Sequence, residues 1–214
     1  MKRHLKREAA PKNWPITRKG TTFVVKNNSK GIPVLVALRD LMKVAKTRSE
    51  VKSAIHNKDL IISGKPVRDE KKSLELFDIL TIVPSKKNYK LVLSQNGKYT
   101  IEETNEKDSK TKISKIIGKK SLKGKKTQIN LSDGRNYLSD VECSVGDSAI
   151  VDIEKKKISK ILPIKENSNA LIIGGKHTGT KGKIIKIIGE HKMVEMEASG
   201  KKFRALIKQL MILD

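Results

Sequence analysis

The sequence predicts an α+β fold that is predominantly β: a basic extended N-terminal tail, a small module of a helix pair plus a hairpin, a central small β-barrel domain and a C-terminal meander of strands. Three observations lead to this prediction. Apolar residues recur at helical spacing only between about residues 34 and 55. Beyond residue 60 they form short runs, which Gly-containing turns separate about every eight to twelve residues. The first 30 residues are basic and carry prolines that interrupt a helix.

The N-terminal segment, residues 1–30, carries nine lysines or arginines against one acid, Glu8. Pro11 and Pro15 lack amide donors and prevent a continuous helix. Because the segment has few apolar side chains, it cannot bury enough surface to order itself. We therefore expect an extended tail that is either solvated or ordered against an anionic partner. Two roles fit Trp14: stacking on a base or ribose, or anchoring the tail against protein.

The charge balance of the whole chain points to a polyanionic partner. The chain has 214 residues, with 47 Lys and Arg against 23 Asp and Glu, and a net charge of +24. Such an excess repels itself unless counter-charge is supplied, and nucleic acid supplies it as phosphates. A membrane partner fits less well, because no apolar run approaches the roughly 18 residues of a spanning helix and no basic amphipathic helix with an aromatic face is evident. The start also lacks the apolar core of a secretory signal.

Aromatic residues make up only 3% of the chain. Readers of single-stranded bases need aromatic faces for stacking, so this composition argues against such a platform. We therefore expect contacts to phosphates and to the shape of folded RNA or of a duplex.

The sequence offers no catalytic or metal-binding constellation. A lone Cys143 fits a reducing compartment and a small core residue. The four histidines lie far apart in sequence, with no cysteine pair nearby. The Gly-rich stretch 174–183 has two glycines at the spacing of a phosphate-binding loop, but Thr180 stands where the lysine belongs and a β-branched strand follows. We expect no enzyme, no cofactor, no metal and no small-molecule substrate.

The module at residues 31–88 accounts for the predicted helices. Apolar side chains at three- and four-residue spacing predict a helix with one buried stripe, formed by Val34, Leu35, Leu38, Leu41, Met42 and Ala45. Residues 47–50 have the pattern of a capping box, in which Thr47 accepts from the amide of Glu50 and the Glu50 carboxylate reaches back. A second, shorter helix follows. Strands are expected at 60–62 and 79–83, with a turn at 63–66.

The rest of the chain has the pattern of short strands. In residues 89–166 we expect strands at 89–93, near 113 and 116, and at 128–131, 137–138 and 149–153, with an acidic loop or helical turn at 102–108. Residues 167–214 predict a meander of strands at 170–173, 184–188, 194–197 and 202–206. With roughly 50 residues, this last unit is small for independent stability and should pack on the middle one.

These segments together resemble the archaeal and eukaryotic S4e family of small-subunit ribosomal proteins, over essentially the whole chain. Residues 4–20 resemble its N-terminal signature, and residues 32–40 with 64–69 resemble its S4-type RNA-binding module. Residues 131–136 resemble a motif of its central domain. Residues 174–182 resemble its KOW motif, with Gly182 at the key glycine, where a missing Cβ would let the loop turn with φ > 0 or let backbone approach RNA.

The resemblance implies a structural protein bound to small-subunit rRNA beside neighbouring small-subunit ribosomal proteins, in cytoplasmic ribosomes and without enzymatic activity. It divides the chain into a tail (1–30), an S4-type module (31–88), a central β domain (89–166) and a KOW domain with an SH3-like barrel (167–214). The residues expected to contact RNA are Lys2, Arg3, His4, Lys6, Arg7, Lys12, Trp14, Arg18, Lys19, Arg39, Lys43, Lys46, Arg48, Lys52, Lys65, Arg68, Lys176, His177, Lys181 and Lys183.

Two alternatives remain at this point. Each of these cationic side chains could instead be an ordinary solvated surface residue. The whole chain could also be a non-ribosomal RNA-binding factor, either an RNA-modification protein that carries an S4-type module or a transcription-associated KOW protein.

Overall fold

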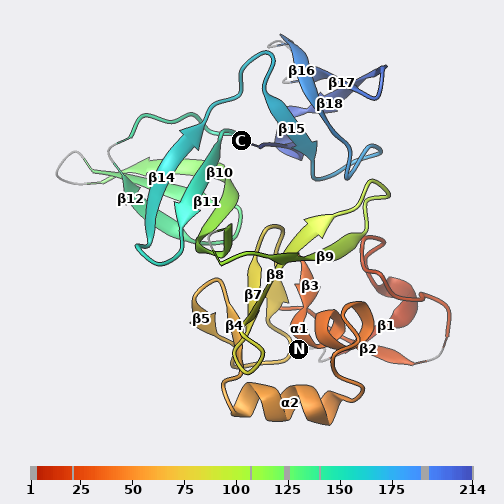
Figure 1. Cartoon of the computed structure of the whole chain (residues 1–214). Helices are drawn as coiled ribbons and strands as arrows, with labels where there is room; N and C mark the ends of the chain where they lie inside the picture. The colour runs from red at the N-terminus through yellow and green to blue at the C-terminus, as the bar shows by residue number, and fades with distance from the viewer. Residues whose placement is uncertain are drawn as a thin grey trace. The chain divides into compact units, whose positions relative to one another are not determined.

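The computed structural model describes residues 4–20, 22–106, 108–122, 126–139, 141–188 and 193–213. The chain divides into two compact units (Figure 1). The first comprises the described residues up to Leu93 together with Lys98–Ser109. The second comprises Ser94–Gly97 and the described residues from Lys110 onward. Strands dominate both units, which confirms the predicted α+β, predominantly β class.

The first unit is built on a five-stranded antiparallel sheet in the order β5-β4-β7-β8-β9, with two shorter strand pairs, β1-β2 and β3-β6. Its strands are β1 (His4–Lys6), β2 (Phe23–Val25), β3 (Ile32–Pro33), β4 (Leu60–Ile62), β5 (Lys65–Pro66), β6 (Ser73–Leu74), β7 (Ile79–Ile82), β8 (Lys87–Leu93) and β9 (Tyr99–Thr104). Strand β8 pairs with β7, so the stretch predicted to begin the central domain belongs to this sheet instead.

Strand β9 takes up the first part of the stretch 102–108, for which an acidic loop or helical turn was predicted, and a 3₁₀ turn follows at Asp108–Lys110. The acidic side chains of Glu102 and Glu103 lie opposite Lys90 and Tyr89 of β8. The carboxylate of Glu103 also forms an ion pair with Lys87, 3.1 Å apart. Cross-strand pairs of opposite charge stabilise a sheet, and this compensates for the low strand propensity of glutamate.

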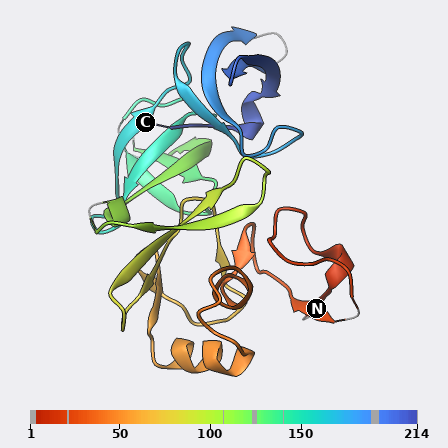
Figure 2. The same ribbon diagram turned by 45° about the vertical axis from the view of Figure 1, so that its right-hand side comes forward.

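The N-terminal segment is folded and not extended, in contrast to the prediction. Strand β1 pairs with β2 in antiparallel register, and a 3₁₀ turn at Arg7–Ala9 follows β1 (Figure 2). Two arginines fasten this segment: Arg7 donates to the carbonyl of Thr17, and Arg18 donates to the carbonyl of Glu8. These side-chain bonds supply the local order that composition alone does not reveal.

Trp14 explains why the segment folds back. Its side chain is 1% exposed and belongs to the core of the first unit. The indole N–H donates to the carbonyl of Gly31 at 2.9 Å, so the polar atom of the ring is satisfied in the interior. The backbone carbonyl of Asn13 accepts from the amide of Tyr99 in β9. Of the two roles considered for Trp14, the structure shows the anchor.

The helical region agrees with the predicted pattern in part. The first helix is a short α-turn, α1 (Val34–Val36), continued by a π-helical turn at Ala37–Leu41, and Lys43 follows with φ of 57°. It ends earlier than predicted, and residues 34–38 are buried on all sides instead of along one stripe. The second helix is α2 (Arg48–His56).

The predicted capping box at the start of α2 is confirmed. The hydroxyl of Thr47 accepts from the amide of Glu50 at 3.3 Å, and the Glu50 carboxylate accepts from the amide of Lys46 at 2.8 Å. The Lys46 amide and the Thr47 hydroxyl, which both donate to the Glu50 carboxylate, hold the pKa of Glu50 below its ordinary value, because they favour the charged form.

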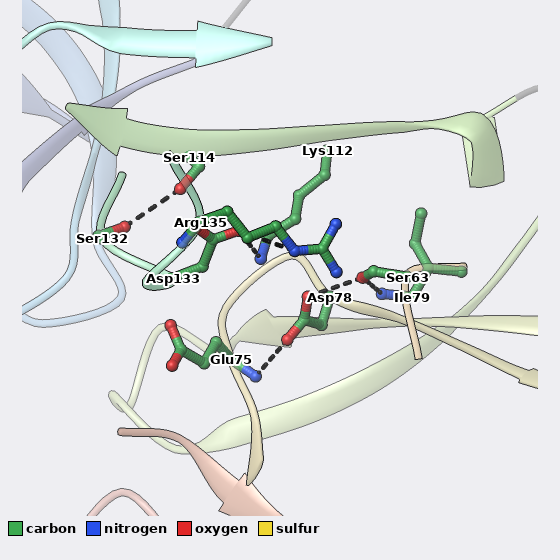
Figure 3. A network of polar contacts seen from close by, with 9 residues as sticks. All are labelled: Ser63, Glu75, Asp78, Ile79, Lys112, Ser114, Ser132, Asp133 and Arg135. Carbon is green, nitrogen blue, oxygen red and sulfur yellow. Dashed lines mark hydrogen bonds and ion pairs between the residues drawn. The ribbon is translucent and has the colours of Figure 1, made fainter. Parts of the chain in front are cut away.

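A buried carboxylate fixes the turn before β7 (Figure 3). Asp78, 5% exposed, accepts from the hydroxyl of Ser63 at 2.7 Å and from the amide of Glu75 at 2.8 Å. The Ser63 oxygen in turn accepts from the amide of Ile79. The end of β4 is therefore tied to the start of β7 by polar contacts inside the core.

The second unit contains two five-stranded antiparallel sheets, in the orders β12-β11-β10-β13-β14 and β18-β17-β16-β15-β19. Its strands are β10 (Thr111–Ser121), β11 (Thr127–Leu131), β12 (Asn136–Ser139), β13 (Ser148–Asp152), β14 (Lys157–Leu162), β15 (Asn169–Ile172), β16 (Lys181–Ile188), β17 (Met193–Ala198), β18 (Lys201–Leu206) and β19 (Leu210–Ile212). A short 3₁₀ turn at Ile207–Gln209 also belongs to this unit, whereas the 3₁₀ turn at Asp108–Lys110 spans the boundary between the two units in the sequence.

The first of these sheets curls into a partial barrel, because its outer strands β12 and β14 lie close together. Gly118 lies inside the long strand β10, at an irregularity of register, and does not end a strand as the sequence suggested. Strand β14 was not predicted, because the exposed polar residues Lys157, Ser159 and Lys160 interrupt its apolar pattern. The apolar Ile158 and Leu162 of the same strand point inward.

A buried ion pair joins β10 to the turn between β11 and β12. The Lys112 ammonium is 2.8 Å from the carboxylate of Asp133, and their side chains are 3% and 6% exposed (Figure 3). Burial raises the pKa of Asp133, but the charge of Lys112 and the amide of Arg135 outweigh it, so the net pKa is lowered. Asp133 thus fixes the turn that joins β11 to β12.

Gly182 has a different role from the one expected. It lies in β16, and a Cβ there would overlap the carbonyl oxygen of Glu197 in β17 and approach the Cβ of Ala198 to 3.1 Å. The missing Cβ therefore allows two strands of the protein to approach each other. Neither a positive φ nor an approach to RNA is needed to explain it.

The C-terminal segment is fastened to the partial barrel by two buried polar groups. The Lys115 ammonium donates to the carbonyls of Ile207 and Leu210, the latter at 2.6 Å. The Ser148 hydroxyl accepts from the amide of Ile212 at 2.8 Å. Burial lowers the pKa of Lys115 to about 8. The last domain therefore packs on the middle one, as its small size predicted.

We predict that Gly182→Val lowers the free energy of unfolding by about 1–3 kcal/mol or more, because β16 and β17 must separate to accept the side chain. Thermal unfolding measures this loss. Gly118→Ala is the matched control, since a Cβ there would meet its nearest neighbour at 3.9 Å. Equal melting temperatures for Gly182→Val and wild type would contradict the strand-contact explanation.

We also predict that stability depends on the titration of Lys115. Its pKa is about 8 in the fold and 10.5 as the ordinary value, so the unfolded chain binds more protons between these values. The stability of the wild type should therefore rise from pH 8 to 10.5 relative to a Lys115→Met variant. Denaturant unfolding at several pH values tests this, with Lys155→Met, on an exposed turn, as control. A difference that is independent of pH would disprove it.

Candidate RNA-binding surfaces

A basic groove lies between α2 and the segment that follows β5. It has a volume of about 600 Å³. Lys52, His56 and Lys58 line one side, and Arg68 and Lys71, with the acidic Asp69 and Glu70 between them in sequence, line the other. Lys52 and Arg68 were predicted from the sequence, and the structure brings them together. His56, Lys58 and Lys71 were missed, although the spacing of Lys52 and His56 places them one turn apart on the exposed face of α2.

Arg48 is one turn before Lys52 but is engaged in the protein. Its Nε lies 2.8 Å from a carboxylate oxygen of Glu70, and its Nη2 contacts the other oxygen. The side chain of Glu70 is only 5% exposed. The hydrogen bond and charge of Arg48 lower the pKa of Glu70, and Glu70 raises that of Arg48. Arg48 therefore neutralises a buried carboxylate and positions the wall of the groove.

The remaining predicted residues of this module are spread over its surface. Arg39 is paired with its neighbour Asp40, at 2.8 Å. Lys43, Lys46 and Lys65 are exposed. The structure does not bring these three lysines into the groove.

The N-terminal segment presents fewer free cations than its sequence suggests. Arg7 and Arg18 bind carbonyls of their own segment, and Trp14 is buried and cannot stack on a base. Lys6, Lys12 and Lys19 are exposed, as is His4, whose ring meets that of Phe23 edge to face at 4.4 Å. Lys2 and Arg3 lie outside the residues that the structure describes.

The C-terminal domain presents a second cationic surface. Lys181 and Lys183 are both exposed, and as alternate residues of β16 they point to the same face. Lys176 and His177 are exposed in the preceding loop, where the hydroxyl of Thr178 donates to the carbonyl of Gly175 at 2.7 Å. The ring of His177 stacks on Phe203 of β18 at 4.9 Å. Phe203 was missed, because nothing in the sequence shows which side of β18 faces the loop.

The described residues offer little support for a metal site, a membrane-spanning helix or a reactive thiol. Among them, no group of three or more His, Cys, Asp and Glu side chains is arranged to hold a metal ion. In the same part of the chain, no helix is both long and apolar enough to cross a membrane. Burial raises the pKa of the Cys143 thiol, which is half-buried against the core of the partial barrel. A thiol with a raised pKa is a poor nucleophile at neutral pH.

Comparison with known families gives two matches along the chain. Residues 85–158 match the model of ribosomal family S4e, and residues 1–29 match that of the RS4NT domain. The small ribosomal subunit protein eS4 of Methanosphaera stadtmanae is 34% identical, and the alignment covers 99% of this chain and 92% of that protein. The eS4 protein of Methanocella arvoryzae is 35% identical over 86% of this chain and 80% of its own length.

A solved structure shares the fold. The crystal structure of the 30S ribosomal protein S4e from Thermoplasma acidophilum superimposes with a TM-score of 0.73 at 23% identity. The superposition covers 85% of this chain and 94% of the other. The chain therefore shares its fold with an experimentally determined structure.

We predict that Arg48→Met lowers the free energy of unfolding by about 1–3 kcal/mol at neutral pH, because it leaves the buried Glu70 carboxylate without its cation. In the wild type the pKa of Glu70 lies below its ordinary 4.5, so the contribution of the pair is complete above 4.5 and is lost as pH falls through the lowered pKa. The difference between variant and wild type should therefore shrink below about pH 4.5.

Denaturant unfolding of both chains at neutral and acidic pH measures this. Arg39→Met is the matched control, because Asp40 is less buried and the loss should stay under about 1 kcal/mol. A loss for Arg48→Met that is the same at pH 3 and pH 7 would refute the assignment to Glu70.

Proposed function

The chain belongs to ribosomal family S4e, and on that premise we propose that it is a structural constituent of the small ribosomal subunit. In this role it binds and stabilises folded rRNA through phosphate contacts and so supports translation. The observation that supports this most is the disposition of charge: buried carboxylates are used in internal contacts, while most lysines are exposed around them. A net charge of +24 then remains for a polyanion.

We propose that three basic regions share the contacts to rRNA. They are the exposed lysines of the N-terminal segment, the groove between α2 and the segment after β5, and the KOW surface around Lys176, Lys181 and Lys183. Arginines suit two-pronged phosphate contacts, and lysines act as point charges. The central partial barrel would serve as the scaffold of the KOW domain and contact neighbouring ribosomal proteins.

The same proposal makes the chain a component of cytoplasmic ribosomes without catalytic activity. The surfaces described above are cationic and open, and their chemistry is that of binding. The runner-up, a non-ribosomal RNA-modification or transcription-associated KOW protein, differs in the particle with which the chain would be found.

Sedimentation of a cell lysate in sucrose gradients after a high-salt wash tests the proposal. We expect the chain to remain with the small subunit. Release into the soluble fraction, or migration with RNA polymerase, would overturn it and favour the runner-up. Detection of modified nucleosides after incubation with RNA would also contradict the absence of catalysis.

We predict that replacing Lys176, Lys181 and Lys183 by Gln weakens binding of small-subunit rRNA and flattens its salt dependence. The slope of log K against log salt should fall by about 0.7–0.9 for each phosphate contact that is lost. A filter-binding series over salt concentration measures this slope. Substitution is preferred to deletion of residues 1–20, because the deletion would also remove Trp14 from the core.

The control carries the same change of charge at three exposed residues: Lys155 and Lys156, in the turn between β13 and β14, and Lys157, the first residue of β14. Its slope should stay close to that of the wild type. If both triple variants lose affinity equally, the KOW surface has no special part in binding.

A further inference from the structure

We infer that a hollow in the first unit, beside the β1–β2 pair, binds one unstacked base of an RNA strand. The hollow has a volume of about 520 Å³ and is lined by residues of β1, β2, α1 and the helical region after it. The inference rests on the proposed function, because RNA is its ligand. It adds base stacking, a contact that binding of phosphates alone does not include.

The aromatic wall of the hollow is Phe23. Its side chain is 59% exposed, although it lies in a paired strand opposite Lys6. The ring of His4 meets it at 4.4 Å with an angle of 65° between the planes, which supports one side of the phenyl group. An exposed, well-placed aromatic face is the feature on which proteins stack unpaired bases.

The floor of the hollow is apolar. Val24 and Leu35 line it, and each is 3% exposed. A phosphate group would lose its hydration there without gaining a partner, whereas a base presents an apolar face of its own. The floor therefore fits the base and not the backbone of a nucleotide.

The rim is cationic. Arg39, Arg48 and Lys71 line it, and the two arginines are each paired with a carboxylate, Asp40 and Glu70. Lys71 takes part in none of the ion pairs found within the described residues, so the rim keeps a positive charge. An aromatic face with cations at its border is the combination that holds single strands, with the base on the ring and the phosphates at the rim.

The low aromatic content does not argue against a single site of this kind. A platform for several bases needs several rings, whereas one unstacked base needs one. The chain has three phenylalanines, of which Phe77 is buried, while Phe23 and Phe203 each contact a histidine of a basic segment. Composition counts aromatic residues but does not show where they lie.

The test uses the full chain and a short single-stranded RNA with 2-aminopurine at its centre, whose fluorescence falls when the base stacks. Phe23→Leu keeps the apolar bulk and removes the aromatic ring, and Phe23→Tyr restores the ring. We expect the probe to be quenched by the wild type and by Phe23→Tyr. Phe23→Leu should weaken binding by roughly fivefold to a hundredfold and remove the quenching.

Thermal unfolding should be the same for Phe23→Leu and wild type, because the side chain is mostly exposed, so the loss cannot be attributed to misfolding. Equal binding and quenching by Phe23→Leu and wild type would overturn the inference. Sedimentation of Phe23→Leu with the small subunit distinguishes this inference from the proposed function. If the variant stays with the subunit and affects the probe as the wild type does, the base-binding inference is wrong and the proposed function stands. If neither the wild type nor Phe23→Leu sediments with the small subunit, the proposed function and this inference are both wrong.

Discussion

The excess of positive charge is the constraint on which the rest of this structure depends. A chain with 47 cationic and 23 acidic side chains repels itself when compact, so each acid has a large effect on stability. The fold places several of these acids inside: Glu70 holds Arg48, Asp133 holds Lys112, and Asp78 accepts from a hydroxyl and an amide. These buried carboxylates are thereby engaged in internal contacts, and most lysines remain on the surface, where a polyanion can reach them.

Hydrophobic anchors complement this use of charge. Trp14 brings a segment with nine cationic residues in its thirty back to the first unit, and its indole is satisfied by a single carbonyl. Lys115 and Ser148 fasten the C-terminal strand to the partial barrel in the second unit. Both anchors join segments distant in sequence, so the cationic loops are carried on well-ordered backbone. Ordered loops lose less entropy when they bind.

The sequence was sufficient for the fold class, the capping box and most strands, because local periodicity and turn residues carry those signals. It was insufficient wherever the local structure depends on a residue that is distant in the sequence. The acidic strand β9 depends on lysines of β8, the ordered N-terminal segment depends on the site that receives Trp14, and Gly182 depends on Glu197 across the sheet. For the candidate surfaces, sequence reasoning found Lys52, Arg68, Lys181 and Lys183, but it did not distinguish them from arginines engaged in internal pairs or foresee the position of Phe23.

The central claim is that the charge excess of the free chain is balanced by rRNA. Thermal unfolding as a function of salt, with and without small-subunit rRNA, tests it most directly. The account predicts that salt stabilises the free chain by screening, that rRNA stabilises it further at low salt, and that high salt abolishes the contribution of rRNA. A melting temperature that responds neither to salt nor to rRNA would contradict it.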